Sequence, residues 1–175
     1  ILNKNGEILY ESLKKVKSLG FFSNFGYSIY NFFNLKRMCK KFRPDIIQCP
    51  YNIFDRRLVK KNYLNFLKKE GIEIHARSIF LQGLLLMPFK KIPKFHKKWK
   101  GLFYKWEKWL YNNNLGSVEA CLNFALQTKE IDKFVIGFNS LIHLKQILKV
   151  NEKKKIIFPK HLLSNDKKLI NPSLW

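Results

Sequence analysis

The sequence predicts an α/β protein built on a parallel sheet, and three observations support this prediction. Short apolar runs that suit strands alternate with stretches whose apolar residues recur every three or four positions, as in amphipathic helices. Glycine or proline punctuates these segments. The 175 residues are 46% apolar and 15% aromatic, which is enough to fill a core and argues against disorder. The order strand, helix, strand, helix is typical of parallel strands joined by crossovers.

The first elements are expected in the opening quarter of the chain. A helix is predicted over 6–19 and ends at Gly20. Its apolar face carries Leu9, Leu13 and Val16. The aromatic run 21–28 is predicted as the first strand. A second helix is predicted over 30–42, where Arg43-Pro44 breaks it.

The central elements follow the same alternation. A short buried strand is predicted at 46–49. A helix over 55–69 begins at an aspartate placed to cap it, and Gly71 is placed to stop it. Its inward residues are expected to be Val59, Tyr63, Phe66 and Leu67. The third and fourth strands are predicted at 72–80 and 134–136.

A long insertion, 87–132, separates the third and fourth strands. It contains two amphipathic patterns, predicted as a helix over 95–111 and a second over 118–126 with Ser117 as its N-cap. No repeat or low-complexity linker divides the chain. We therefore expect residues 1–175 to form a single domain.

The third strand has a polar face. Its apolar set is Ile72, Ile74 and Ala76, and its alternating polar set is Glu73, His75 and Arg77. Parallel strands covered by helices on both faces are normally apolar throughout. One face of this strand therefore meets something polar, which is either a barrel lumen that leads to a ligand site or the solvent at an exposed edge.

The net charge of +22 comes mainly from lysine. Only five of the 34 basic residues are arginine, and the lysines are spread along the whole chain. Planar recognition of bases and phosphates favours arginine, whereas scattered lysine is typical of a solvated surface or of biased composition. This pattern disfavours nucleic-acid binding as the main role and remains compatible with an anionic small ligand.

Cysteine usage and hydropathy bear on the cellular compartment. Cys39, Cys49 and Cys121 are odd in number and lack metal-ligand spacing, so we expect buried or free thiols in a reducing cytoplasm. The longest apolar stretch, 79–89, is about half the ~20 residues of a membrane span. The start, Ile1 to Gly6, has neither a signal-peptide pattern nor an initiating Met, and we expect further residues upstream.

Four segments in succession resemble the C-terminal half of the aldo/keto reductase family, whose members are (β/α)8 TIM barrels that reduce carbonyls with NADPH. The segments are KSLGFFSNFGYSIY (17–30), DIIQCPYN (45–52), IHARSIFLQGLL (74–85) and VIGFNS (135–140). The resemblance implies an α/β half barrel of about four parallel strands with helices. The ending LINPSLW (169–175) is also similar to that of a branch linked to surface-sugar biosynthesis.

The resemblance places the nicotinamide end of the coenzyme at three strand ends. Ser28 and Gln48 occupy positions that hold the carboxamide, whose amide needs both a donor and an acceptor. Ile29 stands where many members have Asn, and Arg77 where many have an aromatic ring that stacks on nicotinamide. Arg77 could stack on the ring, bind an acidic substrate group, or form an ion pair with Glu73 or another acid of the lumen.

The resemblance implies further coenzyme contacts after the third and fourth strands. Those expected to line the NADP(H) site are Ser78, Phe80, Gln82, Gly137, Phe138, Asn139, Ser140 and Gln146. A small-residue loop that opens onto a helix N-terminus presents backbone N–H groups to phosphate. The alternatives are that Ser28 and Ser140 act as caps, that Gln48 satisfies a backbone group, and that Phe80 belongs to the core.

No catalytic or metal-binding residue is predicted in this chain. The family's proton-donating Tyr and its Asp, Lys and His partners belong to the first half of the barrel, and the four histidines here lack triad or zinc spacing. We expect part of an NADP(H)-dependent reductase of a small carbonyl substrate that needs the N-terminal half of the barrel. The alternatives are a non-catalytic coenzyme-binding relative, or a basic module that binds nucleic acid or an anionic surface through 94–109.

Overall fold

Four parallel strands form the centre of the molecule in the computed structural model, which describes residues 1–60, 62–150 and 156–175. The strands are β1 (Gly26–Ser28), β2 (Ile46–Pro50), β3 (Glu73–Arg77) and β4 (Lys133–Phe134), hydrogen-bonded in the order of the sequence. Strands that are adjacent in sequence and parallel in space require crossovers, so the predicted α/β sheet is confirmed.

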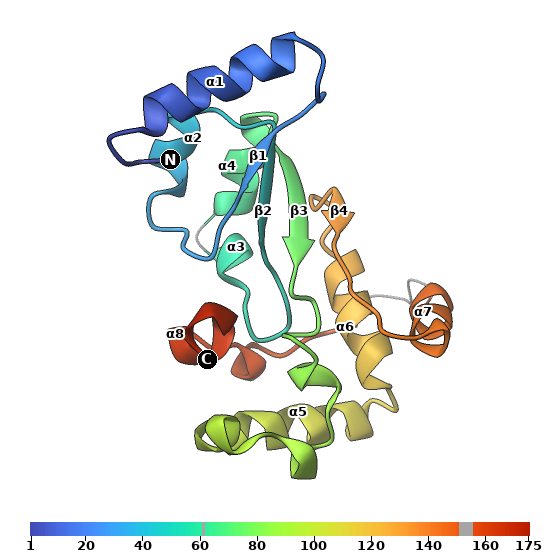
Figure 1. The fold of residues 1–175 in the computed structure, drawn as a ribbon. Helices are drawn as coiled ribbons and strands as arrows, with labels where there is room; N and C mark the ends of the chain where they lie inside the picture. Colours follow the sequence, from blue (N-terminus) through green and yellow to red (C-terminus); the bar gives the residue numbers. More distant parts are fainter. Residues whose placement is uncertain (61, 151–155) are drawn as a thin grey trace.

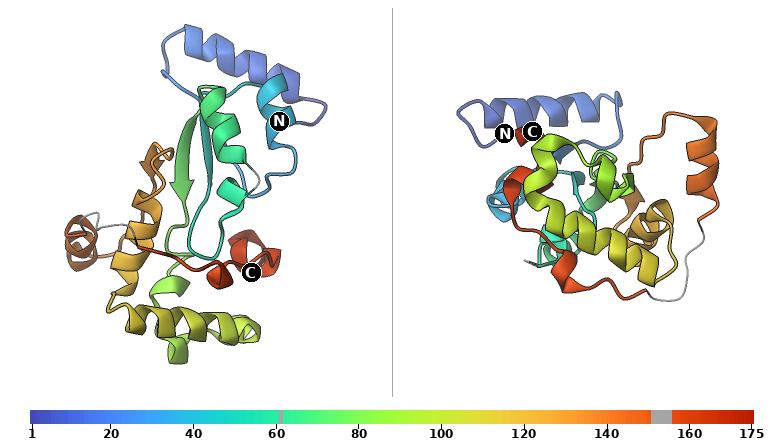
Figure 2. Two further views of the ribbon diagram at one scale, coloured as in Figure 1. Left: turned by 180° about the vertical axis from the view of Figure 1, so that it is seen from behind. Right: turned by 90° about the horizontal axis from the view of Figure 1, so that it is seen from below.

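Helices surround this sheet, and their positions are seen in Figures 1 and 2. The α-helices are α1 (Gly6–Ser18), α2 (Leu35–Lys41), α3 (Arg57–Lys60), α4 (Tyr63–Lys69), α5 (Lys100–Asn112), α6 (Ser117–Leu126), α7 (Leu141–Leu148) and α8 (Lys167–Ile170). Short 3-10 turns lie at Leu84–Leu86, Phe89–Lys91, Lys94–Trp99, Lys160–Leu162 and Pro172–Leu174. α5 lies beyond the end of the sheet toward which the strands point, and α1 lies at the opposite end.

The first strand and the second helix are shorter than predicted. Residues 21–25 are not in a strand, because β2 begins only at Ile46 and pairs first with Gly26. Gly26 approaches β2 so closely that a Cβ there would clash with the Ile46 carbonyl oxygen. The helix predicted over 30–42 begins at Leu35, since the Asn31 side chain accepts a hydrogen bond from the Phe33 amide and holds a turn instead.

The helix predicted over 55–69 is two helices, α3 and α4. Asn62, in the left-handed region with φ of 56°, lies at the break. Val59, predicted to face inward, is exposed, whereas Leu64 and Leu67 are buried. The Asp55 carboxylate does accept the Arg57 amide at 3.3 Å, as a cap does.

The two predicted helices of the insertion are present with shifted starts. The first pattern opens as a 3-10 turn and becomes α5 only at Lys100, with Phe103 and Trp106 buried as its periodicity predicts. The N-cap of α6 is Gly116 and not Ser117. Trp106 donates its indole N–H to the Leu85 carbonyl at 3.0 Å and so ties α5 to the segment after β3.

The two faces of the sheet differ as the alternation in β3 predicts. Ile47, Cys49, Ile74 and Ala76 are fully buried and belong to the core, together with residues of α4 and α6. The opposite face carries the half-buried polar set of β3, and Gln48 lies beside His75 in the register. β3 lies between β2 and β4, so an exposed edge does not account for its polar face.

All three cysteines are free and buried, as expected. Burial raises the pKa of the Cys39 thiol to about 11 and that of the Cys49 thiol to about 12, so both stay protonated at neutral pH. No helix of the described residues is both long and apolar enough to cross a membrane.

Candidate functional site

The carboxyl ends of β1, β2 and β3 bring three predicted site residues into contact. The Ser28 hydroxyl donates to Gln48 Oε1 at 3.2 Å and accepts from Arg77 Nε at 3.3 Å. Ser28 and Gln48 are paired in the register of β1 and β2, so their side chains lie on the same face of the sheet. Parallel pairing with this register is therefore what assembles the cluster.

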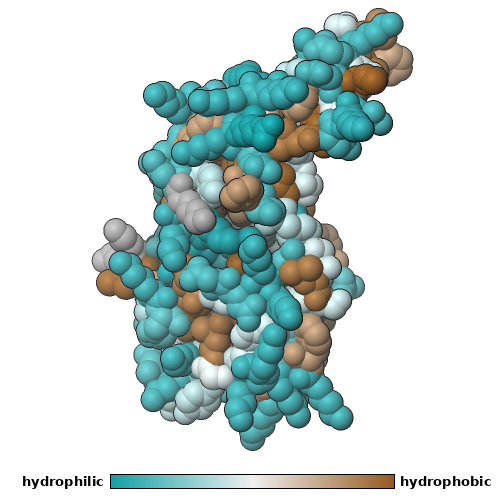
Figure 3. Space-filling model, turned by 90° about the vertical axis from the view of Figure 1, so that its left-hand side faces the viewer, coloured by the Kyte–Doolittle hydropathy of each residue, from teal (hydrophilic) through white to brown (hydrophobic). Residues whose placement is uncertain are grey.

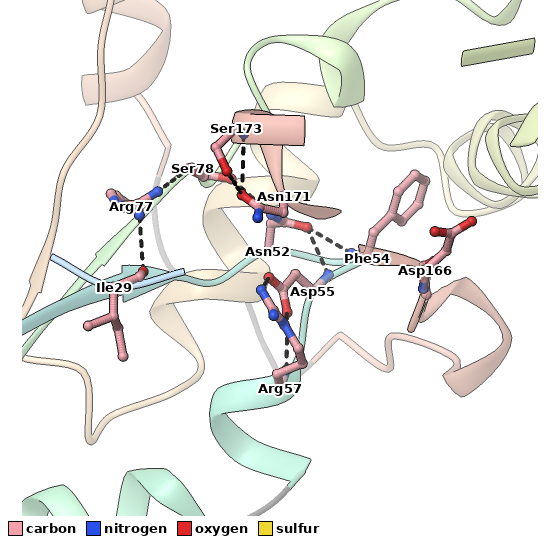
Figure 4. A network of polar contacts seen from close by, with 11 residues as sticks. Ile29, Asn52, Phe54, Asp55, Arg57, Arg77, Ser78, Asp166, Asn171 and Ser173 are labelled. Atoms are coloured by element: carbon pink, nitrogen blue, oxygen red, sulfur yellow. Dashed lines mark hydrogen bonds and ion pairs between the residues drawn. The ribbon is translucent and has the colours of Figure 1, made fainter. Parts of the chain in front are cut away.

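Arg77 is held from several sides. Its Nη1 donates to the Ser78 hydroxyl at 3.2 Å, its Nη2 donates to the Ile29 carbonyl at 3.0 Å, and the guanidinium carbon lies 3.9 Å from the centre of the Tyr30 ring. The first two contacts are drawn in Figure 4. The alternative of an Arg77–Glu73 ion pair is wrong, because Glu73 pairs with His75 and Lys133.

A cavity of about 700 Å³ opens beside this cluster. Eight of the eleven predicted coenzyme-site residues line it, namely Ser28, Arg77, Ser78, Phe80, Gln82, Gly137, Phe138 and Asn139. Gln48 does not line it but bonds to Ser28 on its wall. Ser140 and Gln146 do not line it. The segments after β1, β3 and β4 thus converge on one cavity, whose use for coenzyme stays a prediction.

The loop after β4 leads directly into α7. The Ser140 hydroxyl accepts the His143 amide at 3.2 Å, so Ser140 is the N-cap of α7, as the structural alternative proposed. Its hydroxyl hydrogen can still be donated. Gln146, two turns along, is exposed.

The loop after β3 has an unusual backbone. Ser78, Leu81, Gln82 and Gly83 all have positive φ, which costs free energy for residues other than glycine. Leu81 is fully buried, so its packing holds this conformation. The turn directs Ser78, Phe80 and Gln82 to the cavity wall.

Asn52, just after β2, is hydrogen-bonded to this loop. Its Nδ2 donates to the Ser78 carbonyl at 3.0 Å, and its Oδ1 accepts from the amides of Phe54 and Asp55. Asn52 is 1% exposed, so these bonds form in a dry interior. The Asp55 carboxylate in turn binds the Arg57 guanidinium through two bonds of 2.8 Å (Figure 4). The cavity wall therefore rests on a buried polar network.

Several cavity residues were not predicted from the sequence. They are Tyr30, Ile79, Gly83, Leu86, Val135, Ile136 and His143. Tyr30 carried a readable signal, since it follows Ser28 by two residues and continues the same side of an extended chain. His143 had the signal of a third position in the helix that follows the small-residue loop. The apolar members gave none beyond hydropathy.

The charges around the cavity are unequal. None of the described residues that line its wall is an aspartate or a glutamate. The acid nearest in sequence to Arg77 on β3, Glu73, has its pKa lowered by hydrogen bonds from Lys133 and His75, and its negative charge is paired with the Lys133 ammonium. Within the described part of the chain, no group of three or more His, Cys, Asp or Glu residues could hold a metal ion. Among the described residues, the cavity wall thus carries one arginine and no carboxylate.

Comparisons with known proteins agree with this architecture. The profile described as Aldo/keto reductase family matches residues 6–156. The aldo-keto reductase AKR11C1 from Bacillus halodurans is similar in fold. Its holo form has a TM-score of 0.66 and 17% identity over 95% of this chain and 56% of that one. For its apo form the values are 0.68, 16%, 99% and 60%.

The glycerol dehydrogenase AKR11B4 from Gluconobacter oxydans has a TM-score of 0.51 and 17% identity, over 84% of this chain and 55% of that one. A comparison with curated proteins gives no match. The chain therefore spans little more than half the length of these solved relatives. The family profile covers most of the sequence, and the chain belongs to the aldo/keto reductase family, with its four parallel strands and their helices forming part of a (β/α)8 barrel.

Proposed function

We propose that this chain supplies the coenzyme-binding, C-terminal half of an NADP(H)-dependent reductase of aldehydes or ketones. The observation that supports it best is the convergence of Ser28, Arg77 and Asn139, from three different strand ends, on one cavity. Barrel enzymes bind their ligands at this end of the strands. Residues 1–175 then act as one partial domain of a cytoplasmic enzyme, completed by the N-terminal half of the barrel.

The contacts at β1 and β2 suit a carboxamide. Ser28 Oγ and Gln48 Oε1 already bond to each other, which leaves the Gln48 amide N–H groups and a lone pair of the serine to face a ligand. A carboxamide needs one acceptor for its NH₂ and one donor for its oxygen. This pair therefore fits the group and would determine which face of the nicotinamide is presented to substrate.

The loop after β4 suits the phosphates. Gly137, Phe138 and Asn139 lie on the cavity wall, and the N-terminus of α7 follows directly. Backbone N–H groups at a helix N-terminus favour negative charge. Ser140 contributes by capping α7, and Gln146 is proposed to contact the adenine end, although neither residue lines the cavity itself.

The coenzyme, when bound, supplies the hydride that reduces the carbonyl carbon. This chain's residues orient the ring and hold the phosphates. No proton donor is assigned to it, because the family's Tyr, Asp, Lys and His motifs have no counterpart here. We therefore expect residues 1–175 alone to bind coenzyme weakly and to have no turnover.

The test uses the full-length protein and NADPH. We expect NADPH fluorescence to change on binding, and NADPH absorbance to fall when an aldehyde is added. Asn139→Asp places a negative charge beside the proposed phosphates and should weaken NADPH binding at least about tenfold. Asn24→Asp, which adds the same charge at the amino end of β1, is the matched control. Full-length protein that binds no NADPH would contradict the proposal.

Two alternatives predict different results. A non-catalytic relative would bind NADPH as described and oxidise none. A basic module would show salt-dependent binding of nucleic acid or anionic vesicles that Lys→Glu changes at 97, 98 and 100 abolish. Against this module, Phe103 and Trp106 are buried and cannot stack on bases, which leaves Phe95 and Tyr104 as the exposed aromatic side chains of the segment. Figure 3 shows hydrophilic side chains over most of one side of the molecule, as a solvated lysine-rich surface requires.

A further inference from the structure

Arg77 is a cation without a counter-ion. Among the described residues, no carboxylate lies within 4 Å of it, and its three hydrogen-bond acceptors are two hydroxyls and one carbonyl. The half-buried guanidinium therefore has only neutral hydrogen-bond acceptors in the described part of the chain. Among the described residues, Arg77 is the only lysine or arginine on the wall of the 700 Å³ cavity, and none of the lining residues is an acid.

The guanidinium is fixed and still has donors to offer. Nε and one N–H of each terminal nitrogen are used, so one N–H on each of Nη1 and Nη2 remains. Stacking on Tyr30 at 3.9 Å restricts its plane. Two donors on one rigid fork match the paired oxygens of a carboxylate or phosphate. Little side-chain freedom is lost when such a group binds.

The geometry points to an anionic group of the substrate as the ligand of Arg77, so we propose that the reduced carbonyl compound carries a carboxylate or a phosphate. This rests on the proposed function, because Ser28 and Gln48 then place the nicotinamide beside Arg77. The coenzyme's own phosphates are expected at the loop 137–140, which follows β4, whereas Arg77 ends β3. The oxidised nicotinamide is cationic and cannot be the partner.

The test compares matched substrates with the full-length protein. One pair is 4-carboxybenzaldehyde and its methyl ester, and the second is glyceraldehyde 3-phosphate and glyceraldehyde. We expect kcat/KM to favour the charged member of at least one pair about ten- to hundredfold, as charge-assisted hydrogen bonds allow. The pair that shows the preference identifies carboxylate or phosphate as the group.

Arg77→Met should bring the ratio of kcat/KM for the charged substrate to kcat/KM for the neutral substrate close to one. This expectation holds even if the variant lowers both kcat/KM values by a common factor. Arg77→Lys keeps the charge but loses the fork, so it should give an intermediate ratio. Lys133→Met removes a cation from β4, the strand next to Arg77, where Lys133 pairs with Glu73. This variant should leave the ratio of kcat/KM for charged and neutral substrates unchanged. If Lys133→Met lowered this kcat/KM ratio as much as Arg77→Met does, the preference would come from the overall positive potential of the protein and not from a binding site at Arg77.

The two proposals fail differently. If wild-type protein oxidises NADPH with equal kcat/KM for both members of each pair, the anion site is wrong and the reductase stands. If no substrate is reduced, terephthalate and inorganic phosphate serve as calorimetric probes. Binding of either that Arg77→Met abolishes supports the anion site without the reductase. Equal binding, or none, overturns it.

Discussion

The two ends of the sheet are built from different interactions. At the amino ends, Asp45 accepts the Phe25 amide at 3.0 Å and pairs with Lys17 at 2.7 Å, while Asp132 accepts the Ile74 amide and pairs with Lys68, both near 2.7–2.8 Å. Each aspartate thus joins a neighbouring strand to a helix and has its charge matched.

At the carboxyl ends, the charge is unmatched and the backbone is strained. Arg77 has only neutral acceptors, and the following loop holds Ser78, Leu81 and Gln82 at positive φ. The difference indicates that the residues at the amino ends of the strands serve stability and those at the carboxyl ends serve ligand binding, as in barrel enzymes. Substitutions at the two ends should therefore affect different measurements.

The largest expected effect on stability comes from the buried core face of the sheet, between its two ends. Ile74 is fully buried at the centre of β3, so Ile74→Ala should lower the free energy of unfolding by about 2–5 kcal/mol. Urea unfolding of the full-length protein measures it. The adjacent His75→Ala, on the half-buried polar face, should cost under about 1 kcal/mol. Similar costs for the two would mean that the faces are not distinct.

The next effect belongs to the amino end. Asp132→Ala leaves the Ile74 amide without its 2.7 Å acceptor and should cost about 1–3 kcal/mol of stability. NADPH affinity should change less than about twofold, because no ligand contact is lost. Lys68→Met, which removes the partner but keeps the amide bond, should cost less than about 1 kcal/mol. A large loss of NADPH affinity in Asp132→Ala would contradict the separation of the two ends.

The carboxyl end should show the reverse behaviour. Ser28→Ala removes the hydroxyl that joins Gln48 and Arg77 and should weaken NADPH binding by about two- to tenfold, the value of one or two neutral hydrogen bonds. Stability should change little, since Ser28 is exposed. Ser23→Ala, at an exposed serine of the opposite end, is the control. Equal affinities for both variants would remove Ser28 from the site.

The smallest effect is a pH dependence at the amino end. Burial raises the pKa of Asp45, but the Lys17 ammonium and the Phe25 amide together lower this pKa by more than burial raises it. The pKa of Asp45 in the folded protein therefore lies below the ordinary value. Its contribution to stability is therefore complete above about pH 4 and is lost as the pH falls through the lowered folded pKa.

Asp45→Asn should cost about 0.2–1 kcal/mol at neutral pH, since it removes the charge pair and keeps an acceptor for the Phe25 amide. The difference from wild type should shrink as the pH falls below about 4, because the wild-type carboxylate then becomes protonated. Unfolding curves at neutral and acid pH measure it. A difference that grows in acid would show that the sign is wrong.

Much of the fold could be predicted from the sequence, with errors that have one cause. The order of strands and helices follows from apolar periodicity, which is a local property. Element lengths were overestimated at 21–28 and 30–42, because a strand lasts only as long as its neighbour and an asparagine can hold a turn in place of a helix. An asparagine also lies at the break between α3 and α4, where Asn62 has a positive φ. The apolar periodicity of 55–69 gives no clear sign of this break.

The candidate site was predicted through motifs and corrected by contacts. Ser28, Arg77 and Asn139 do line one cavity, but Tyr30 and His143 were missed and Gln146 is not on its wall. The proposed Arg77–Glu73 pair fails on strand geometry, since residues four apart along a strand are roughly 13 Å apart.

The sequence by itself determined the alternating elements, the polar and apolar faces of β3 and the lysine-rich character of the surface, since each depends on residues a few positions apart or on composition. Only the tertiary structure decided which charges are matched and which cation remains for a ligand. Ser28 and Arg77 are 49 residues apart in the chain. Their contact exists only because parallel strands bring their carboxyl ends to the same edge, and local patterns carry no information about such distances.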